Sequence, residues 1–253
     1  MDATLVLVHG AGGGAWEWIV WEETIRALQP SWECISVHLS PLEGKDYETT
    51  SLEDYVEQVI SSGQTVNRDK RLLVLIGASM GGTLTAKAAE TLQPDALVFV
   101  CTTIPLLIGR SSSTRPPPAP LSPARIEWQG GHLQATVDAL PDATLDMCEF
   151  ACARWRDESG AVVNSINAGV EVNLISPTAG GGVPMCFVVP GDDDSIPPTR
   201  QVAFAHEIGA ACVLEYEGMS HVGPLLGTRA SEVCRDVVAF LLRDVAELGA
   251  AEQ

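Results

Sequence analysis

The chain has 253 residues, of which 46% are hydrophobic and 19% are charged, a balance typical of a globular protein rather than a disordered one. Its 33 acidic and 15 basic side chains give a formal net charge of −18, which repels phosphate backbones and anionic membrane surfaces. No apolar run in the sequence is long enough to span a bilayer. We therefore expect neither nucleic acid nor a membrane as a partner.

The N-terminus and the cysteines both favour a reducing compartment. Residues Met1 to Leu5 lack the basic head of a secretory signal and lead directly into a strand pattern. The seven cysteines form no CxxC pair and no Cys/His cluster with zinc-like spacing, so we expect free thiols and no metal. These features predict a cytoplasmic protein without a metal, nucleotide or organic cofactor. They leave its oligomeric state open between a monomer and a homodimer.

Six short β-rich runs alternate with helical patterns along the chain. The runs are Thr4–Val8, Cys34–His38, Leu72–Ile76, Ala96–Cys101, Met185–Val189 and Cys212–Tyr216. Most are continuously apolar, as expected of strands covered on both faces of a parallel sheet. Apolar residues recur at helical spacing behind a capping-box start at Ser51 and Asp54, and again at Met80/Leu84/Ala88 and Val233/Val237/Leu241/Val245. This order predicts a doubly wound, mostly parallel, six-stranded α/β sheet.

One long stretch, residues 102–182, contains no convincing sheet strand. Helical spacing recurs within it, at Leu145/Cys148/Cys152 and at Ile166/Val170/Leu174. The stretch is too long for a simple loop. We interpret it as a helical cap inserted into a single domain of residues 1–253. The alternative is a set of ordinary crossover helices with no lid role.

The first apolar run leads into a glycine-rich segment, His9-Gly10-Ala11-Gly12-Gly13-Gly14-Ala15-Trp16. This segment lacks the lysine of a phosphate-binding loop, and the third glycine of a dinucleotide fingerprint would fall on Ala15. A wide turn that frees backbone N–H groups fits better. We expect the N–H groups of Ala11 and Met80 to face a developing oxyanion, with His9 bracing the loop.

The third apolar run ends in Gly77-Ala78-Ser79-Met80-Gly81, a GxSxG pattern between a strand and a helix. The sharp turn at such a junction needs small neighbours and lifts the serine hydroxyl above the carboxyl edge of the sheet. The following helix points its N-terminus at the same place, which favours developing negative charge. Ser79 is therefore the predicted nucleophile. The alternative is a tight turn whose serine only caps the helix.

The predicted base and acid follow the last two strands. His221 lies in the loop before the last long helix, at the carboxyl edge where sites gather in open α/β sheets. The fifth strand leads to three consecutive aspartates, Asp192, Asp193 and Asp194. The usual spacing after the glycine selects Asp194, with Asp193 as the runner-up. The resulting order of Ser, Asp and His along the chain is that expected of a nucleophile-elbow hydrolase.

These motifs together resemble the α/β-hydrolase superfamily, and most of all its branch of plant methylesterases and hydroxynitrile lyases. The resemblance in layout covers nearly the whole chain, whereas motif identity is confined to the short loops. The lyases of this branch have threonine where this chain has Gly10 and lysine where it has Val222, which favours an esterase-like site. Gly13 replaces a histidine of the plant proteins, so their substrates are not carried over. The resemblance implies that Trp16 and Trp128 shape a pocket with Gly10 and Gly12, although packing of Trp16 against the first helix is an equal alternative.

The predicted function is that of a serine hydrolase that cleaves an ester-like bond, a carboxylic ester or lactone, of a small organic substrate through an acyl-enzyme. The same fold also carries lyases, C–C bond hydrolases and cyclases. A small-molecule receptor that uses the same pocket is the alternative from a different class. Turnover distinguishes a receptor from the enzymes.

Overall fold

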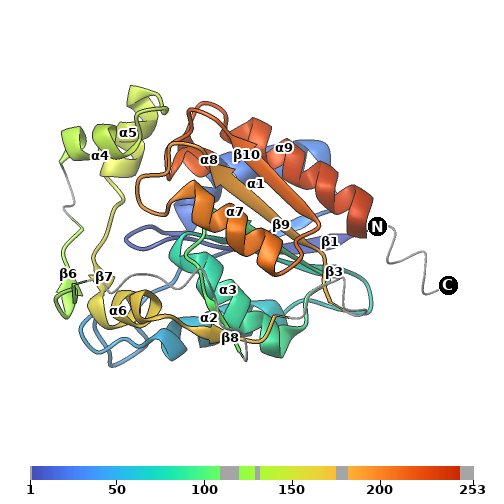
Figure 1. Cartoon of the computed structure of the whole chain (residues 1–253), viewed down its shortest axis with the longest axis horizontal. Helices are drawn as coiled ribbons and strands as arrows, with labels where there is room; N and C mark the ends of the chain where they lie inside the picture. Colours follow the sequence, from blue (N-terminus) through green and yellow to red (C-terminus); the bar gives the residue numbers. More distant parts are fainter. Residues whose placement is uncertain (1, 109–119, 129–131, 175–181, 246–253) are drawn as a thin grey trace.

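A computed structural model describes residues 2–108, 120–128, 132–174 and 182–245 of the chain. One sheet of six parallel strands forms its centre, in the order β10-β9-β4-β3-β1-β2 (Figure 1). These strands are β1 (Ala3–Val8), β2 (Glu33–Val37), β3 (Leu72–Ala78), β4 (Ala96–Val100), β9 (Met185–Pro190) and β10 (Cys212–Tyr216). The predicted doubly wound α/β fold is confirmed, and the predicted strand ends differ from the observed ones by only one or two residues.

Successive side chains of each buried strand point to opposite faces of the sheet, so a hydrophobic core forms on each face. In β1, Leu5 and Leu7 belong to one core, whereas Val6 and Val8 belong to the other. The first core includes residues of α1 (Ile19–Leu28), α8 (Gly223–Leu226) and α9 (Ala230–Phe240). The second includes residues of α2 (Leu52–Gln64), α3 (Met80–Leu92) and α7 (Pro198–Glu207).

Local signals explain where several helices begin and end. The Ser51 side chain accepts a hydrogen bond from the Asp54 N–H, and the Asp54 side chain accepts one from the Ser51 N–H, which is the predicted capping box of α2. The last apolar repeat of the chain was predicted to be one helix. It divides into α9 and a π-helical turn, η3 (Leu241–Val245).

The segment between β4 and β9 adds no strand to the central sheet within its described residues. Its elements are β5 (Leu106–Leu107), β6 (Arg125–Ile126), α4 (Leu133–Ala139), α5 (Leu145–Cys152), β7 (Glu158–Ser159), α6 (Gly160–Ala168) and β8 (Glu171–Val172). Helix α6 lies beside α2 and α3, whereas α4 and α5 stand apart from the sheet at the upper left of Figure 1. The interpretation of residues 102–182 as a cap stays a prediction, and residues 109–119, 129–131 and 175–181 lie outside the described part.

The helical spacing predicted for Ile166, Val170 and Leu174 is wrong beyond Ala168. Gly169, with φ of +98°, ends α6, and Val172 lies in β8, which pairs with β5. An apolar residue at every fourth position was therefore a coincidence of a helix followed by a strand.

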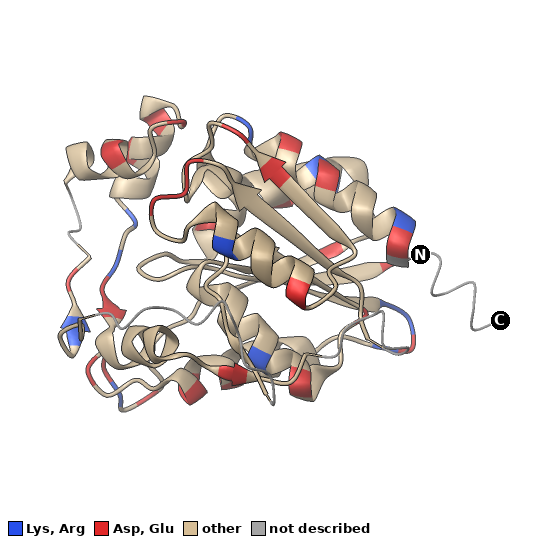
Figure 2. Ribbon diagram, viewed as in Figure 1, with Lys and Arg blue, Asp and Glu red and all other residues tan. Residues whose placement is uncertain are grey.

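Acidic residues outnumber basic ones by 33 to 15. Figure 2 shows Asp and Glu positions, in red, on helices and connecting loops. Across the described residues, we find no helix with both the length and the apolar character needed to cross a membrane.

Candidate active site

The turn between β3 and α3 holds Ser79 in a strained backbone conformation, with φ of +51° and ψ of −120°. Its N–H donates to the carbonyl oxygen of Val100 at 2.9 Å, which fixes the turn to the neighbouring strand β4. A Cβ on Gly77 would lie 2.3 Å from the carbonyl oxygen of Gly81, and one on Gly81 would lie 2.3 Å from that of Val8. Backbone therefore fills the space on both sides of Ser79, and only glycine fits at these two positions.

The structure brings Ser79, His221 and Asp193 into one chain of hydrogen bonds. His221 Nε2 lies 3.0 Å from Ser79 Oγ, and His221 Nδ1 lies 2.9 Å from both carboxylate oxygens of Asp193. The Asp193 side chain is fully buried and that of His221 is 15% exposed. With Nδ1 donating to the carboxylate, Nε2 is free to accept the serine proton.

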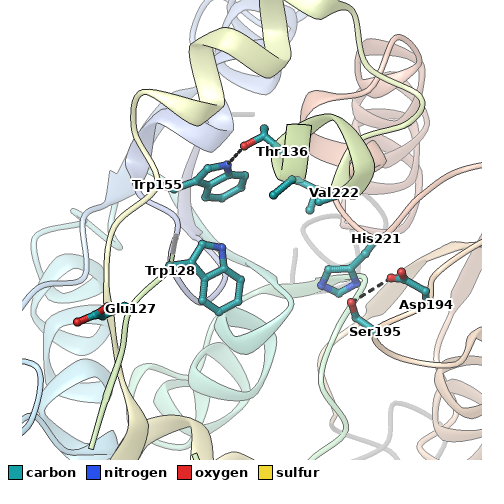
Figure 3. Close-up of a pocket in the computed structure, with 10 residues that line it drawn as sticks. Glu127, Trp128, Thr136, Trp155, Asp194, Ser195, His221 and Val222 are labelled. Carbon is teal, nitrogen blue, oxygen red and sulfur yellow. Dashed lines mark hydrogen bonds between the residues drawn. The ribbon is translucent and has the colours of Figure 1, made fainter. Parts of the chain in front are cut away.

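The predicted pairing of His221 with Asp194 is wrong, because the preceding residue takes that place. The Asp193 carboxylate also accepts the N–H groups of Ser195 at 3.0 Å and Ile196 at 2.8 Å, and the side-chain amide of Gln201 at 2.9 Å. Asp194 is exposed and accepts a hydrogen bond only from the Ser195 hydroxyl, at 3.2 Å, among the described residues. The turn after β9 thus buries the side chain of the middle aspartate and exposes that of the third. Figure 3 shows Asp194 with its hydrogen bond to Ser195.

A residue of the inserted segment holds the loop that carries His221. Asp142, which follows α4, accepts the Ser220 hydroxyl at 2.5 Å and the Ser220 N–H at 3.1 Å. The carbonyl oxygen of Asp142 also accepts the N–H of Thr228, beyond α8. These bonds fix the residue next to His221, and no sequence spacing indicated them.

The predicted oxyanion donors occupy suitable places. Ala11 lines the cavity that contains Ser79, and Met80 directly follows Ser79 at the N-terminus of α3. Within the described residues, neither the Ala11 N–H nor the Met80 N–H has a hydrogen-bond acceptor. Their role as an oxyanion hole remains a prediction.

His9 is buried at the start of the glycine-rich loop, as expected of a residue that braces it. Its Nδ1 donates to the carbonyl oxygen of Gly10 at 2.7 Å, and its Nε2 accepts the N–H of Leu39 at 3.1 Å. The guanidinium of Arg156 lies 3.2 Å from the same Nε2. Burial, helped by the charge of Arg156, lowers the pKa of His9 to about 3, so its ring is neutral at physiological pH.

Two charged residues of the inserted segment brace the same loop, the half-buried Arg156 and the buried Glu158, and sequence reasoning missed both. The N–H of Arg156 donates to the carbonyl oxygen of Gly12 at 3.0 Å, and its guanidinium donates to that of Gly13. Glu158 accepts the Gly12 N–H at 3.1 Å and the Tyr55 hydroxyl at 2.7 Å. These partners are far apart in sequence, so only the folded chain shows the connection.

Two cavities adjoin at His221. The inner one, of about 170 Å³, is lined among others by Gly10, Ala11 and Ser79. The outer one, of about 400 Å³, opens beside Asp194. Trp128, Trp155, Ser195, His221 and Val222 line both, and Figure 3 shows the two indole rings across the pocket from His221.

The predicted pocket residues divide into two groups. Trp128 lines both cavities, and its ring lies so close to Gly12 that a Cβ there would come within 2.5 Å of it. Trp16 is not among the residues that line these two cavities. Its ring packs edge-on against Trp155, with centroids 5.0 Å apart, and against Phe150. Trp16 therefore shapes the pocket through Trp155 rather than by facing it.

Comparisons with known proteins identify the family and agree with the fold. The model of the alpha/beta hydrolase family matches residues 5–237. Norfluorocurarine synthase 2 from a Strychnos species is 23% identical over 255 residues, covering 92% of this chain and 93% of that protein. The solved structure of polyneuridine aldehyde esterase superposes with a TM-score of 0.73 at 21% identity, covering 95% of this chain and 99% of the other. A methylesterase from Arabidopsis gives 0.70 at 16% identity, covering 94% and 98%.

Proposed function

Because this chain belongs to the α/β-hydrolase family, we propose that it is a serine hydrolase that cleaves a carboxylic ester or lactone of a small organic substrate. The observation that carries the proposal is the continuous chain from Ser79 Oγ through His221 to the buried carboxylate of Asp193. That chain opens into a cavity rather than into packed core. The esterases among the structural neighbours favour the same reaction class.

In the proposed mechanism, His221 Nε2 takes the proton of Ser79 as Oγ attacks the carbonyl carbon of the substrate. The N–H groups of Ala11 and Met80 donate to the oxyanion, while Asp193 stabilises the imidazolium. His221 then gives the proton to the leaving alcohol, and the acyl group remains on Ser79. Water, activated by the same histidine, releases the acid and restores the serine.

The size and lining of the pocket fit a small substrate. The inner cavity of about 170 Å³ has room for a short acyl group next to Ser79, and the outer cavity of about 400 Å³ gives the alcohol a path to solvent. Trp128 and Trp155 provide apolar walls.

The test is hydrolysis of a short-chain p-nitrophenyl ester by the wild-type protein and by Ser79→Ala. We expect turnover in the wild type, its loss in Ser79→Ala, and an acyl adduct on Ser79 detectable by mass spectrometry. Ser195→Ala, which removes a neighbouring hydroxyl, should keep turnover well above the Ser79→Ala background. Turnover that survives in Ser79→Ala would contradict the assignment of the nucleophile. Ligand binding without Ser79-dependent turnover would favour a lyase, a cyclase or a receptor.

A further inference from the structure

A buried carboxyl group, Glu17, lies in the inner cavity but takes no part in the Ser79–His221–Asp193 chain. Glu17 belongs to the short helix η1 (Ala15–Trp18) and is only 3% exposed. Its Oε2 accepts the N–H of Gly10 at 3.3 Å. A Cβ on Gly10 would in turn lie 3.6 Å from Ser79 Oγ, so a single glycine separates the carboxyl group from the nucleophile.

No described side chain neutralises this carboxyl group by direct pairing. The titratable groups around it are Arg156 before β7, Cys101 after β4 and His221 after β10. The Arg156 guanidinium gives its hydrogen bonds elsewhere, to Gly13, Tyr47 and His9. Burial also raises the pKa of the Cys101 thiol, which leaves it neutral. No ion pair therefore compensates the cost of a charged Glu17.

Burial accordingly raises the pKa of Glu17 to about 8, against the smaller opposing effects of the Gly10 N–H and Arg156. At neutral pH the side chain is mostly a carboxylic acid. Oε2 accepts from the Gly10 N–H, and within the described part of the chain Oε1 has no hydrogen-bond partner. A carboxylic acid with one oxygen unpartnered, in the wall of a substrate cavity, is a site for a ligand oxygen.

We propose that Glu17 is a specificity-determining residue, whose carboxylic acid donates a hydrogen bond to an uncharged ether, ketone or hydroxyl oxygen on the acyl part of the substrate. The inference rests on the proposed function. The acyl part is assigned to the inner cavity because it stays bound to Ser79 after the alcohol has left through the larger outer cavity. The enzyme then prefers an oxygen-containing acyl group over a hydrocarbon one of the same length.

The experiment compares two esters of equal chain length, ethyl 3-methoxypropanoate and ethyl pentanoate, which differ by an oxygen in place of one methylene. We measure the ratio of their kcat/KM values from about pH 6 to pH 9. Any effect of pH on the Ser79–His221–Asp193 chain is common to both esters and cancels in the ratio. In the wild type, the preference for the methoxy ester should fall about fivefold as pH rises through about 8, because the carboxylate repels the ether oxygen.

Three variants separate the donor from a merely structural role. Glu17→Gln keeps a donor that does not titrate, so its preference should persist at all pH values. Glu17→Leu should lack the preference throughout. Glu23→Gln removes an exposed carboxylate of α1, so its preference for the methoxy ester should fall with pH as it does in the wild type. If Glu17 only supported the Gly10 loop, its variants would slow both esters equally and the ratio would not move.

A wild-type ratio that is independent of pH and unchanged in Glu17→Leu would overturn the inference while leaving the Ser79 hydrolase intact. Hydrolysis of neither ester would instead contradict the proposed function. Equilibrium binding of the same two esters to Ser79→Ala, followed by ligand-observed NMR, then decides the role of Glu17 separately. Preferential binding of the methoxy ester that weakens above about pH 8 supports it, and equal binding refutes it.

Discussion

Replacing Asp193 with asparagine is expected to abolish most of the proposed activity, whereas the same change at Asp194 is not. The buried Asp193 carboxylate lies 2.9 Å from His221 Nδ1 and faces the imidazolium that forms when Ser79 loses its proton. With an effective dielectric constant of about 20, the attraction at this separation is roughly 4–6 kcal/mol. Since about 1.4 kcal/mol corresponds to a tenfold change in rate, kcat should fall by roughly three to four orders of magnitude.

Asp194→Asn is the matched control, because it removes one carboxylate from the same turn. The Asp194 side chain is exposed and contacts the Ser195 hydroxyl, so we expect its kcat to stay within about threefold of the wild type. Both variants are assayed on a p-nitrophenyl ester, with circular dichroism to verify folding. The reasoning is refuted if Asp194→Asn loses three orders of magnitude while Asp193→Asn stays within about tenfold of the wild type.

Three further substitutions test the supporting geometry. Gly81→Ala puts a Cβ 2.3 Å from the carbonyl oxygen of Val8, so the free energy of unfolding in urea should fall by about 3 kcal/mol. Asp142→Ala removes the acceptor of both Ser220 bonds and should lower kcat about tenfold, whereas Asp138→Ala on the exposed side of α4 should not. Because the pKa of Glu17 is raised, the folded protein binds more protons than the unfolded chain between pH 4.5 and about 8. This group therefore lowers the free energy of unfolding as pH rises through that window. The stability of Glu17→Gln relative to the wild type should therefore increase by roughly 3 kcal/mol between about pH 5 and pH 7.5 in thermal or urea unfolding.

The sheet was predictable because its signals are local. A continuously apolar run such as Leu72–Ile76, followed by glycines and a helix, has few alternatives when similar runs alternate with helical patterns along the chain. The same rule failed at Val170, where Gly169 changes the backbone direction and a buried residue continues the helical spacing by chance. Burial pattern alone does not distinguish a short strand from the end of a helix.

The site was predictable only where its residues stand next to secondary structure. Ser79 directly follows β3 and His221 lies in the loop after β10, and their motifs place them at the carboxyl edge. The acid was missed by one position because neighbouring residues of a tight turn point in opposite directions, and the turn dihedrals decide which points inward. A usable signal was present, since an aspartate that accepts the N–H groups two and three residues on forms an Asx-turn, as Asp193 does with Ser195 and Ile196.

The charged side chains beside the glycine-rich loop are site residues that local sequence signals did not predict. Glu17 was a signal, as a charged residue between two tryptophans, but only the structure shows that it lines the cavity that contains Ser79. Arg156 and Glu158 reach the loop from more than a hundred residues away. Their bonds to Gly12 and Gly13 are made to backbone atoms, which carry no sequence signature.

The inserted segment holds two loops of the proposed site. Asp142 holds the loop of the proposed base, and Arg156 with Glu158 holds the loop of the proposed oxyanion hole. Trp155, next to Arg156 in the chain, lines both cavities, so a substrate that packs against its ring contacts the segment that fixes both loops. We therefore expect substrate binding and the alignment of the proposed catalytic groups to be coupled through this segment. A change of substrate range by mutation in this segment should consequently alter kcat together with KM.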